Sequence, residues 1–210
     1  MELYLVRHGE SWSNVEHRLC GLPPGPGLTP RGLGQARAAA ERLLRRAPRP
    51  HAVLSSPLRR ARETAAPYAL AVGLAVQVVD DLRELGFGDW EGRTDADLAP
   101  LPAYRAWRDD PEGWVPPGGE RLSESGERML AALTAHADRL GRGVIVAFGH
   151  HDPMLAFHHR AVGAAGPYPS IAIPNACILH YVRDGLGWRF VDADRSAREA
   201  AGSRGGAARR

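Results

Sequence analysis

The chain has 210 residues, of which 44% are hydrophobic and 24% charged, a composition typical of a globular protein with one substantial core. No apolar run approaches the roughly 20 residues that a membrane-spanning helix needs. No basic region precedes the first apolar residues, so we expect no secretory signal. These features favour a single cytoplasmic α/β domain with no membrane partner.

The basic charge of the chain is concentrated in its last residues. Positions 195–210 hold five Arg and one Glu, so they contribute +4 to a formal net charge of +3 and leave the rest of the chain at −1. A body so close to neutral has no electrostatic footprint for nucleic acid. The tail is rich in Gly, Ala, Ser and Arg and is predicted to be disordered, so we expect one folded domain over residues 1–194.

The two cysteines, Cys20 and Cys177, have neither the spacing of metal ligands nor that of a disulfide framework. This usage fits a reduced, intracellular protein.

Predicted strands and helices alternate along the chain. The predicted strands are residues 3–6, 52–55, 74–79 and 143–148. The predicted helices are residues 30–46, 57–70, 104–108, 123–140 and one that begins at Pro153. Two last strands, 176–182 and 188–191, are predicted to form a hairpin around Asp184-Gly185.

Three helix starts carry a sequence signal. Thr29-Pro30 and Ser56-Pro57 each place an N-capping hydroxyl before a Pro at the first helical position. Asp152 before Pro153 is predicted to cap the last helix. The face of helix 30–46 that we expect to be buried carries Leu33, Ala36, Ala40 and Leu43 or Leu44.

Strands that alternate with helices predict a three-layer α/β/α sandwich around a mostly parallel central sheet. Ligands of such sheets bind at the carboxyl ends of the strands. Four polar segments follow predicted strands and are expected to meet there: residues 7–21, 55–65, 82–92 and 149–153.

Together these segments supply two Arg, two His, an Asn and a carboxylic acid, a set that suits phosphoryl transfer through a covalent phosphohistidine. Arg offers a phosphate monoester paired, planar donors. Donors must surround the phosphorus because charge spreads over three equatorial oxygens during displacement. A carboxyl group beside bound phosphate has a raised pKa, which favours the protonated form that can donate to the leaving group. This chemistry needs neither a metal nor a cofactor.

The four segments also match a family pattern. Arg7-His8-Gly9-Glu10 is followed by Asn14 and Arg18, residues 60–65 read Arg-Ala-x-x-Thr-Ala, Glu84 precedes the Gly-x-Trp-Glu-Gly run of 88–92, and His150 follows a buried strand. In this order and spacing the chain resembles the histidine phosphatase superfamily, which includes the phosphoglycerate mutases. The resemblance spans roughly residues 2–180 and implies a phosphoglycerate mutase-like fold.

The resemblance also implies roles for individual residues. His8 is the expected nucleophile and Glu84 the expected proton donor. Arg7, Arg60 and His150 are expected to form the phosphate pocket with Asn14. The remaining residues expected at the substrate site are Gly9, Cys20, Gly21 and His151. Arg59 and Arg62 are expected to be solvated, and the residues 89–91 to fix a loop.

Three positions depart from the family pattern. His151 stands where the family usually has Gly, Leu155 where it often has Arg, and Arg121 where it often has Ser. These departures concern contacts beyond the phosphate, so the substrate stays open among small-molecule phosphate esters.

Hydrolysis is the first functional prediction. Mutases of the family carry an Arg and a Tyr soon after the proton donor, whereas Glu84 is followed by Leu85-Gly86-Phe87-Gly88-Asp89-Trp90, the pattern of the phosphatase branch. A mutase is the alternative, and a catalytically silent binding protein ranks below it because the nucleophile and the pocket Arg are both present. A homodimer remains open.

Two further patterns have competing interpretations. Tyr104, Trp107 and Trp114 lie in the irregular region 100–119, either in a lid that favours a ring-bearing substrate or in the core. The cluster His151, Asp152, His158 and His159 invites a metal site, but adjacent histidines on a helix point in different directions. We therefore expect no metal there.

Overall fold

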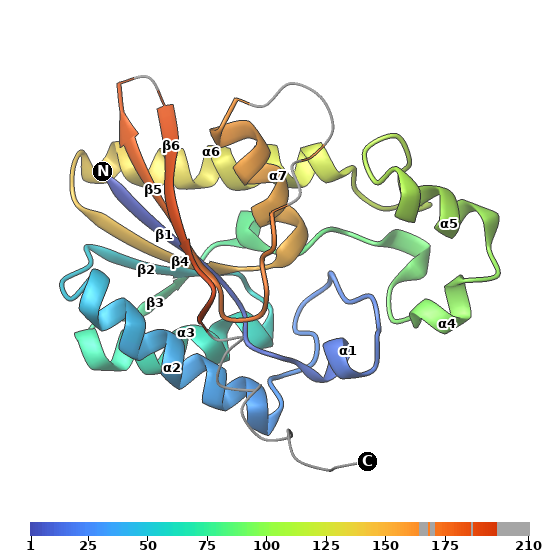
Figure 1. Cartoon of the computed structure of the whole chain (residues 1–210), viewed down its shortest axis with the longest axis horizontal. Helices are drawn as coiled ribbons and strands as arrows, with labels where there is room; N and C mark the ends of the chain where they lie inside the picture. The colour runs from blue at the N-terminus through green and yellow to red at the C-terminus, as the bar shows by residue number, and fades with distance from the viewer. Residues whose placement is uncertain (164–167, 169–170, 186, 197–210) are drawn as a thin grey trace, which may run out of the picture.

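The computed structural model describes residues 1–163, 168, 171–185 and 187–196. These residues form one six-stranded sheet in the order β3-β2-β4-β1-β5-β6 (Figure 1). The strands are β1 (Glu2–Arg7), β2 (Ala52–Ser55), β3 (Val76–Val78), β4 (Val144–Gly149), β5 (Ile178–Asp184) and β6 (Gly187–Asp194). The first four are parallel, whereas β5 and β6 form an antiparallel hairpin beside β1.

Most helices connect strands of the sheet, and a long segment, residues 83–121, extends away from the sheet and carries short helices of its own (Figure 1). They are α1 (Trp12–Val15), α2 (Pro30–Arg46), α3 (Arg59–Val72), α4 (Asp95–Leu98), α5 (Pro102–Asp109), α6 (Leu122–Leu140) and α7 (His151–Ala161), with single 3₁₀ turns η1 (Asp80–Leu82) and η2 (Gly88–Trp90). None of the helices in the described parts of the chain has the length and apolar character that crossing a bilayer requires.

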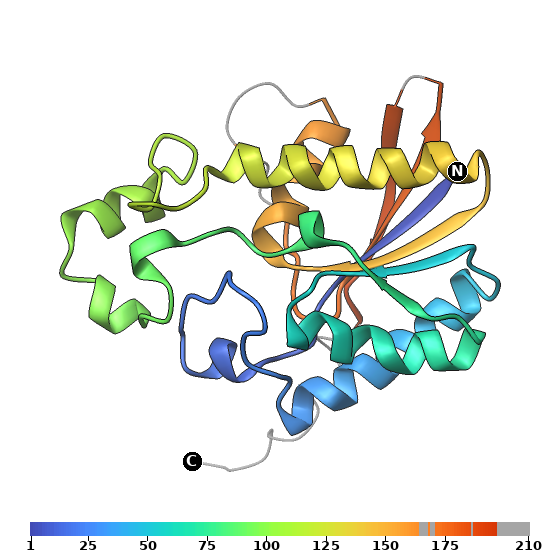
Figure 2. The ribbon, with the colours of Figure 1, turned by 180° about the vertical axis from the view of Figure 1, so that it is seen from behind.

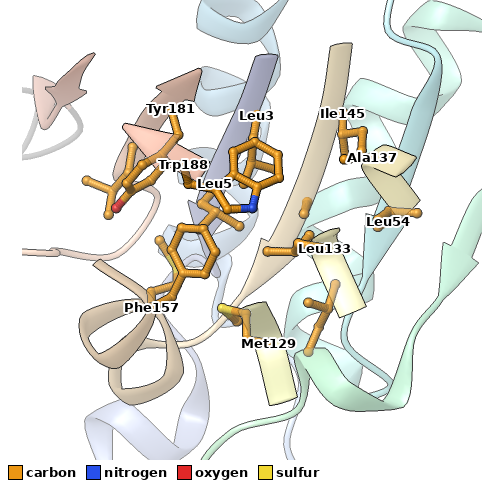
Figure 3. Packing of buried hydrophobic residues seen from close by; sticks show 14 of the residues in the cluster. Leu3, Leu5, Leu54, Met129, Leu133, Ala137, Ile145, Phe157, Tyr181 and Trp188 are labelled. Atoms are coloured by element: carbon orange, nitrogen blue, oxygen red, sulfur yellow. The ribbon is translucent and has the colours of Figure 1, made fainter. Parts of the chain in front are cut away.

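Two helical layers cover the sheet, with α2 and α3 on one face and α6 and α7 on the other (Figures 1 and 2). Side chains of β1 supply the two faces alternately, as the period of a strand requires. Leu3 and Leu5 pack with residues of α6 and α7 (Figure 3), whereas Tyr4 and Val6 pack with residues of α2 and α3. The predicted α/β/α sandwich around a mostly parallel sheet is confirmed.

Some predicted boundaries agree with the structure and others do not. The Thr29 side chain accepts a hydrogen bond from the Gly32 N–H and caps α2, as predicted. Leu33 is 41% exposed, so it does not belong to the buried face of that helix. The predicted strand 74–79 is reduced to Val76–Val78, because it lies at the edge of the sheet and pairs with β2 over three residues.

Two predicted caps are wrong. Ser56-Pro57 does not open α3, which begins at Arg59, because the Ser56 Oγ accepts from the Leu58 N–H in the turn before the helix. Asp152 does not cap α7, since His150 occupies the N-cap position and the Asp152 carboxylate bonds the His151 ring at 2.7 Å. Of the predicted disordered tail, residues 197–210 lie outside the described residues.

The loop after β1 is pressed against the first turn of α2. A Cβ on Gly32 would lie 1.9 Å from the carbonyl oxygen of Glu10, so only glycine permits this approach. The Thr29 N–H also donates to that carbonyl at 3.0 Å. Helix α2 thereby holds the loop that follows His8.

The carboxyl ends of three central strands meet at one edge of the sheet. Arg7 is paired with Gly149, and Ser55 with Phe148. Because β5 runs in the opposite direction, the residues before it reach the same edge, and the Ala176 N–H lies 3.1 Å from the Arg7 carbonyl oxygen. This edge carries the candidate site.

Candidate active site

A polar cavity of about 320 Å³ opens at this edge of the sheet. Seven of the sequence-predicted site residues line it: Arg7, His8, Asn14, Cys20, Arg60, Glu84 and His151. His150 is fully buried directly behind them, with its ring centroid 5.1 Å from that of His8.

The hydrogen bonds of His8 define its tautomer. Its Nδ1 lies 2.6 Å from the Gly9 carbonyl oxygen, which can only accept, so Nδ1 carries the proton. The Arg60 Nε–H donates to Nε2 at 3.1 Å, so Nε2 carries a lone pair. Burial, together with the charges of Arg60 and Arg7, lowers the pKa of His8 well below its usual value. His8 is therefore a neutral imidazole whose lone-pair nitrogen is directed at a guanidinium.

Arg60 lies on the first turn of α3 and is only 3% exposed. Its Nη2 donates to the Cys20 carbonyl oxygen at 2.8 Å and lies 4.0 Å from Glu84 Oε2. Its Nη1 is buried and finds no hydrogen-bond partner among the described residues. Burial lowers the pKa of Arg60, and the charge of Glu84 offsets this effect only in part.

Arg7 ends β1 and supplies a second buried guanidinium. Its Nη1 donates to the Ile173 carbonyl oxygen at 2.7 Å, while its Nε is buried without a partner in the part of the chain that the structure describes. Burial lowers its pKa as well. Two such cations with unsatisfied donors make the cavity suited to an anion.

Glu84 is a buried carboxylic acid of the cavity and is 8% exposed. Its Oε1 accepts from the Leu85 N–H at 3.0 Å, and its Oε2 lies 3.8 Å from His150 Nδ1. Burial raises the pKa of Glu84 to about 7, with Asp152 adding to the effect and Arg60 opposing it. Both protonation states are populated near neutrality, which suits a group that gives and then takes a proton.

His150 lies where β4 ends and α7 begins. Its Nε2 is 2.7 Å from the Ser56 Oγ, and its Nδ1 is buried without a hydrogen-bond partner in the described residues. Burial and the charge of Arg60 lower its pKa well below the usual value. Because Nδ1 lies 3.8 Å from Glu84 Oε2, a proton on Nδ1 would be directed toward the Glu84 carboxylate.

Asn14 is held by the side-chain amide of Asn175, a residue that the sequence analysis does not predict at the site. The Asn175 Nδ2 donates to Asn14 Oδ1 at 3.2 Å and to the His8 carbonyl oxygen at 3.0 Å. The Ser11 N–H also donates to Asn14 Oδ1, at 3.1 Å. Since its oxygen is bonded by protein donors, the NH₂ group of Asn14 is the one that suits a ligand.

The remaining predicted residues have mixed positions. The Gly9 N–H donates to Thr64 Oγ1 at 3.0 Å, and the Gly21 N–H donates to the Glu91 carboxylate at 2.9 Å, so both amides are bonded within the protein. Cys20 lines the cavity and orients Arg60 through its carbonyl group. Eight cavity residues were not among the predicted site residues, although Arg18 belongs to the family motif: Ser13, His17, Arg18, Leu19, Phe87, Asp95, Arg108 and Asp152.

The aromatic residues of the region 100–119 divide between the two interpretations. Tyr104 and Trp107 are buried in a small separate core with Leu85, Phe87, Trp90 and Leu98, while Trp114 is 49% exposed. Trp107 also lines a second pocket of about 370 Å³, which shares Phe87 and four other residues with the polar cavity. This second pocket has apolar walls from Phe87, Trp107 and Leu155 and polar walls from Arg108, His151 and Asp152.

The histidines of α7 that suggested a metal site serve other contacts. His158 Nδ1 lies 2.8 Å from the Tyr181 hydroxyl, and the His159 ring packs on Tyr168 at 4.5 Å. Within the described residues, the group close enough to hold an ion is His8, Glu84 and His150, whose ligand atoms lie within 4.8 Å of one another. The adjacent Arg60 guanidinium makes this cluster better suited to a phosphoryl group than to a cation.

Comparison with known proteins agrees with this geometry. Residues 3–195 match the histidine phosphatase superfamily (branch 1). The adenosylcobalamin/alpha-ribazole phosphatase of Salmonella typhimurium is 40% identical over 197 residues, covering 91% of this chain and 90% of that protein. The glucosyl-3-phosphoglycerate phosphatase of Mycobacterium tuberculosis is 43% identical over 144 residues, covering 66% and 63%.

Solved structures extend the comparison. The mycobacterial glucosyl-3-phosphoglycerate phosphatase in complex with VO3 superposes with a TM-score of 0.79 at 30% identity, covering 90% of this chain and 96% of that one. The chain belongs to the histidine phosphatase superfamily. Within it, the chain is a phosphatase, a phosphoric monoester hydrolase.

Proposed function

We propose that this phosphatase hydrolyses a small-molecule phosphate monoester through a covalent phosphohistidine on His8, with Glu84 as the proton donor. The observation that carries the proposal is the tautomer of His8, whose Nε2 lone pair lies beside Arg60, together with a His8 ring nitrogen that lies within 4.8 Å of a Glu84 carboxylate oxygen. The two buried guanidiniums, Arg7 and Arg60, supply the positive charge that the scheme requires, so the scheme needs no metal.

In the first step, His8 Nε2 attacks the phosphorus and the bond to the ester oxygen breaks. Glu84 gives its proton to the departing alkoxide, and Arg60 releases its contact with Nε2 to bind the equatorial oxygens. In the second step, Glu84 takes a proton from water as the water oxygen attacks phosphorus. The P–N bond breaks, inorganic phosphate leaves, and His8 and Glu84 return to their starting states.

The proposed position for the leaving group is the second pocket beside the cavity. Phe87, Trp107 and Leu155 favour an alcohol with an apolar or ring-bearing part, and Arg108, His151 and Asp152 can bind polar groups of the same alcohol. A sequence relative that covers nine-tenths of both chains is named for alpha-ribazole, and a solved structure that covers 90% of this chain is named for glucosyl-3-phosphoglycerate. Both kinds of ester belong in a substrate panel.

The test is release of inorganic phosphate from this panel with a chelator present. Wild-type protein is expected to release phosphate, and His8→Ala is expected to release none. His136→Ala, a half-buried histidine on α6 away from the cavity, is the matched control. Ring-bearing esters are expected to be turned over faster than small aliphatic ones, and equal rates would exclude the proposed place of the leaving group.

The alternative is a mutase, in which a second hydroxyl group takes the phosphoryl group in place of water. Hydrolysis in ¹⁸O-labelled water is expected to place one labelled oxygen in each phosphate released. Transfer of label-free phosphoryl to an added acceptor alcohol, without phosphate release, would favour the mutase. Binding of esters with neither reaction would favour a silent binding protein.

A further inference from the structure

Glu84 lies in an irregular segment that has little secondary structure of its own. The segment joins η1 to η2, and an arginine on the next long helix holds it. Arg128 of α6 donates from Nη1 to the carbonyl oxygens of Asp81 at 2.7 Å and Arg83 at 2.9 Å. Its Nη2 donates to the carbonyl oxygen of Glu84 itself at 2.9 Å. One guanidinium therefore binds three main-chain carbonyls around the proposed proton donor.

Glu120 completes this arrangement from the other side. Its carboxylate receives two hydrogen bonds from Arg128, at 2.7 Å from Nε and 2.9 Å from Nη2. It also accepts from the Gly86 N–H at 3.2 Å, and the Glu120 N–H donates to the Gly86 carbonyl oxygen at 2.8 Å. Burial alone would raise the pKa of Glu120, but the bonds and charge of Arg128 outweigh burial and lower it. The pair is thus a charged clamp on both flanks of Glu84.

The clamp is mostly buried, with side-chain exposures of 10% for Arg128 and 15% for Glu120. Neither side chain lines the polar cavity, so neither touches the reacting atoms. Their hydrogen bonds reach the site through the backbone that carries the Glu84 carboxyl, while the charge of Arg128 also contributes to the lowered pKa of His150. Displacing a reacting group by about 1 Å can cost on the order of 10²-fold in rate.

We propose that Arg128 and Glu120 are positioning residues that hold the Glu84 carboxyl where it can protonate the leaving group. This inference rests on the proposed role of Glu84. Loss of either side chain is expected to slow the hydrolysis of esters whose alkoxide leaving group needs a proton. It is expected to leave nearly unchanged the hydrolysis of esters whose leaving group departs as a stable anion.

The experiment compares two esters, p-nitrophenyl phosphate and glycerol phosphate, in Arg128→Met and Glu120→Gln. Activity on glycerol phosphate is expected to fall about 10-fold more than activity on p-nitrophenyl phosphate, since a general acid contributes about 10²–10⁴-fold when protonation is needed. The control is Glu127→Gln. Glu127 precedes Arg128 on α6, and its substitution removes an exposed ion pair with Arg160 of α7. An equal loss on both esters would mean a merely structural role and would overturn the inference.

A double variant makes the path through Glu84 explicit. Arg128→Met added to Glu84→Gln is expected to leave the ratio of the two ester activities unchanged, and a further change in that ratio would contradict the inference. Arg128→Lys, which keeps charge but not the paired donors, is expected to restore the ratio only in part. If Arg128→Met fails to fold, Glu120→Gln carries the same readout.

Failure of the proposed function gives a different result. It would appear in the wild type, as absence of His8-dependent hydrolysis of both esters.

Discussion

The Nε–H of Arg60 donates to Nε2 of His8 at 3.1 Å, so the proposed nucleophile is bonded to the cation that the phosphate would meet. This contact keeps the ring oriented and disfavours its protonation, since burial and Arg60 together lower the pKa of His8. A phosphoryl group entering the cavity replaces the contact with stronger, charge-assisted bonds.

Replacement of Arg60 by alanine should reduce kcat/KM by at least about 10²-fold, because an oriented donor to the transition state is lost. Arg60→Lys should recover little, since an ammonium cannot present paired donors. Steady-state kinetics and inhibition by inorganic phosphate measure the effect. Arg62→Ala, one position beyond Ala61 on the exposed side of α3, should behave as wild type. Normal phosphate inhibition in Arg60→Ala would contradict the assigned pocket.

The rate of phosphohistidine formation from an alkyl ester should fall as pH rises through about 7, because Glu84, whose pKa is raised to about 7, loses its proton there. Single-turnover rates across this range measure the effect. In Glu84→Gln the rate should be low and should lack this dependence, while ionisation of the substrate affects both proteins alike. A falling limb that survives in Glu84→Gln would assign the titration to another group.

The same carboxyl should affect the stability of the fold. Its pKa is raised from 4.5 to about 7 by burial, so its stabilising contribution is full below about pH 4.5 and is lost as pH rises through about 7. Glu84→Gln should therefore gain stability relative to wild type, from about zero at pH 4.5 to about 3 kcal/mol at pH 8. Urea unfolding at both pH values measures the difference. A gain that is the same at both would contradict the expectation.

The strand-end residues could be predicted from sequence because parallel strands bring their carboxyl ends to one edge. His8, Glu84 and His150 needed only this rule and the family pattern to be placed together. Asn175 was missed for a related reason. It precedes β5, and the sequence does not reveal that this strand runs antiparallel and brings its amino end to the site.

The clamp could not be predicted from sequence for a different reason. Arg128 lies on a helix that reads as an ordinary charged helix, and Glu120 lies in a Pro- and Gly-rich loop. Nothing in their spacing to Glu84 indicates that they bind its backbone. Likewise, Ser56 has the residue type of a helix cap, but its hydroxyl is occupied by His150 and by the preceding turn.

Close packing at the first turn of α2 should make Gly32 intolerant of substitution. Gly32→Ala places a Cβ 1.9 Å from the Glu10 carbonyl oxygen and should destabilise the fold by about 1–3 kcal/mol, because the loop after His8 must move. Gly34→Ala, with no atom within 4 Å of its Cβ, should instead stabilise by about 0.5–1 kcal/mol. Chemical denaturation measures both. Equal effects of the two would contradict the close contact.

The position of β1 between β4 and β5 has a consequence for synthesis of the chain. Glu2 pairs with Val144 on one side and with Val182 on the other, so the strand that leads to His8 leaves the ribosome long before either neighbour exists. Until β4 and β5 have been synthesised, the apolar residues of β1 have no strand to pair with, and an unpaired strand is prone to associate with other chains. The proposed phosphate pocket is consequently a late product of folding, because it is assembled only once the last strands have been translated.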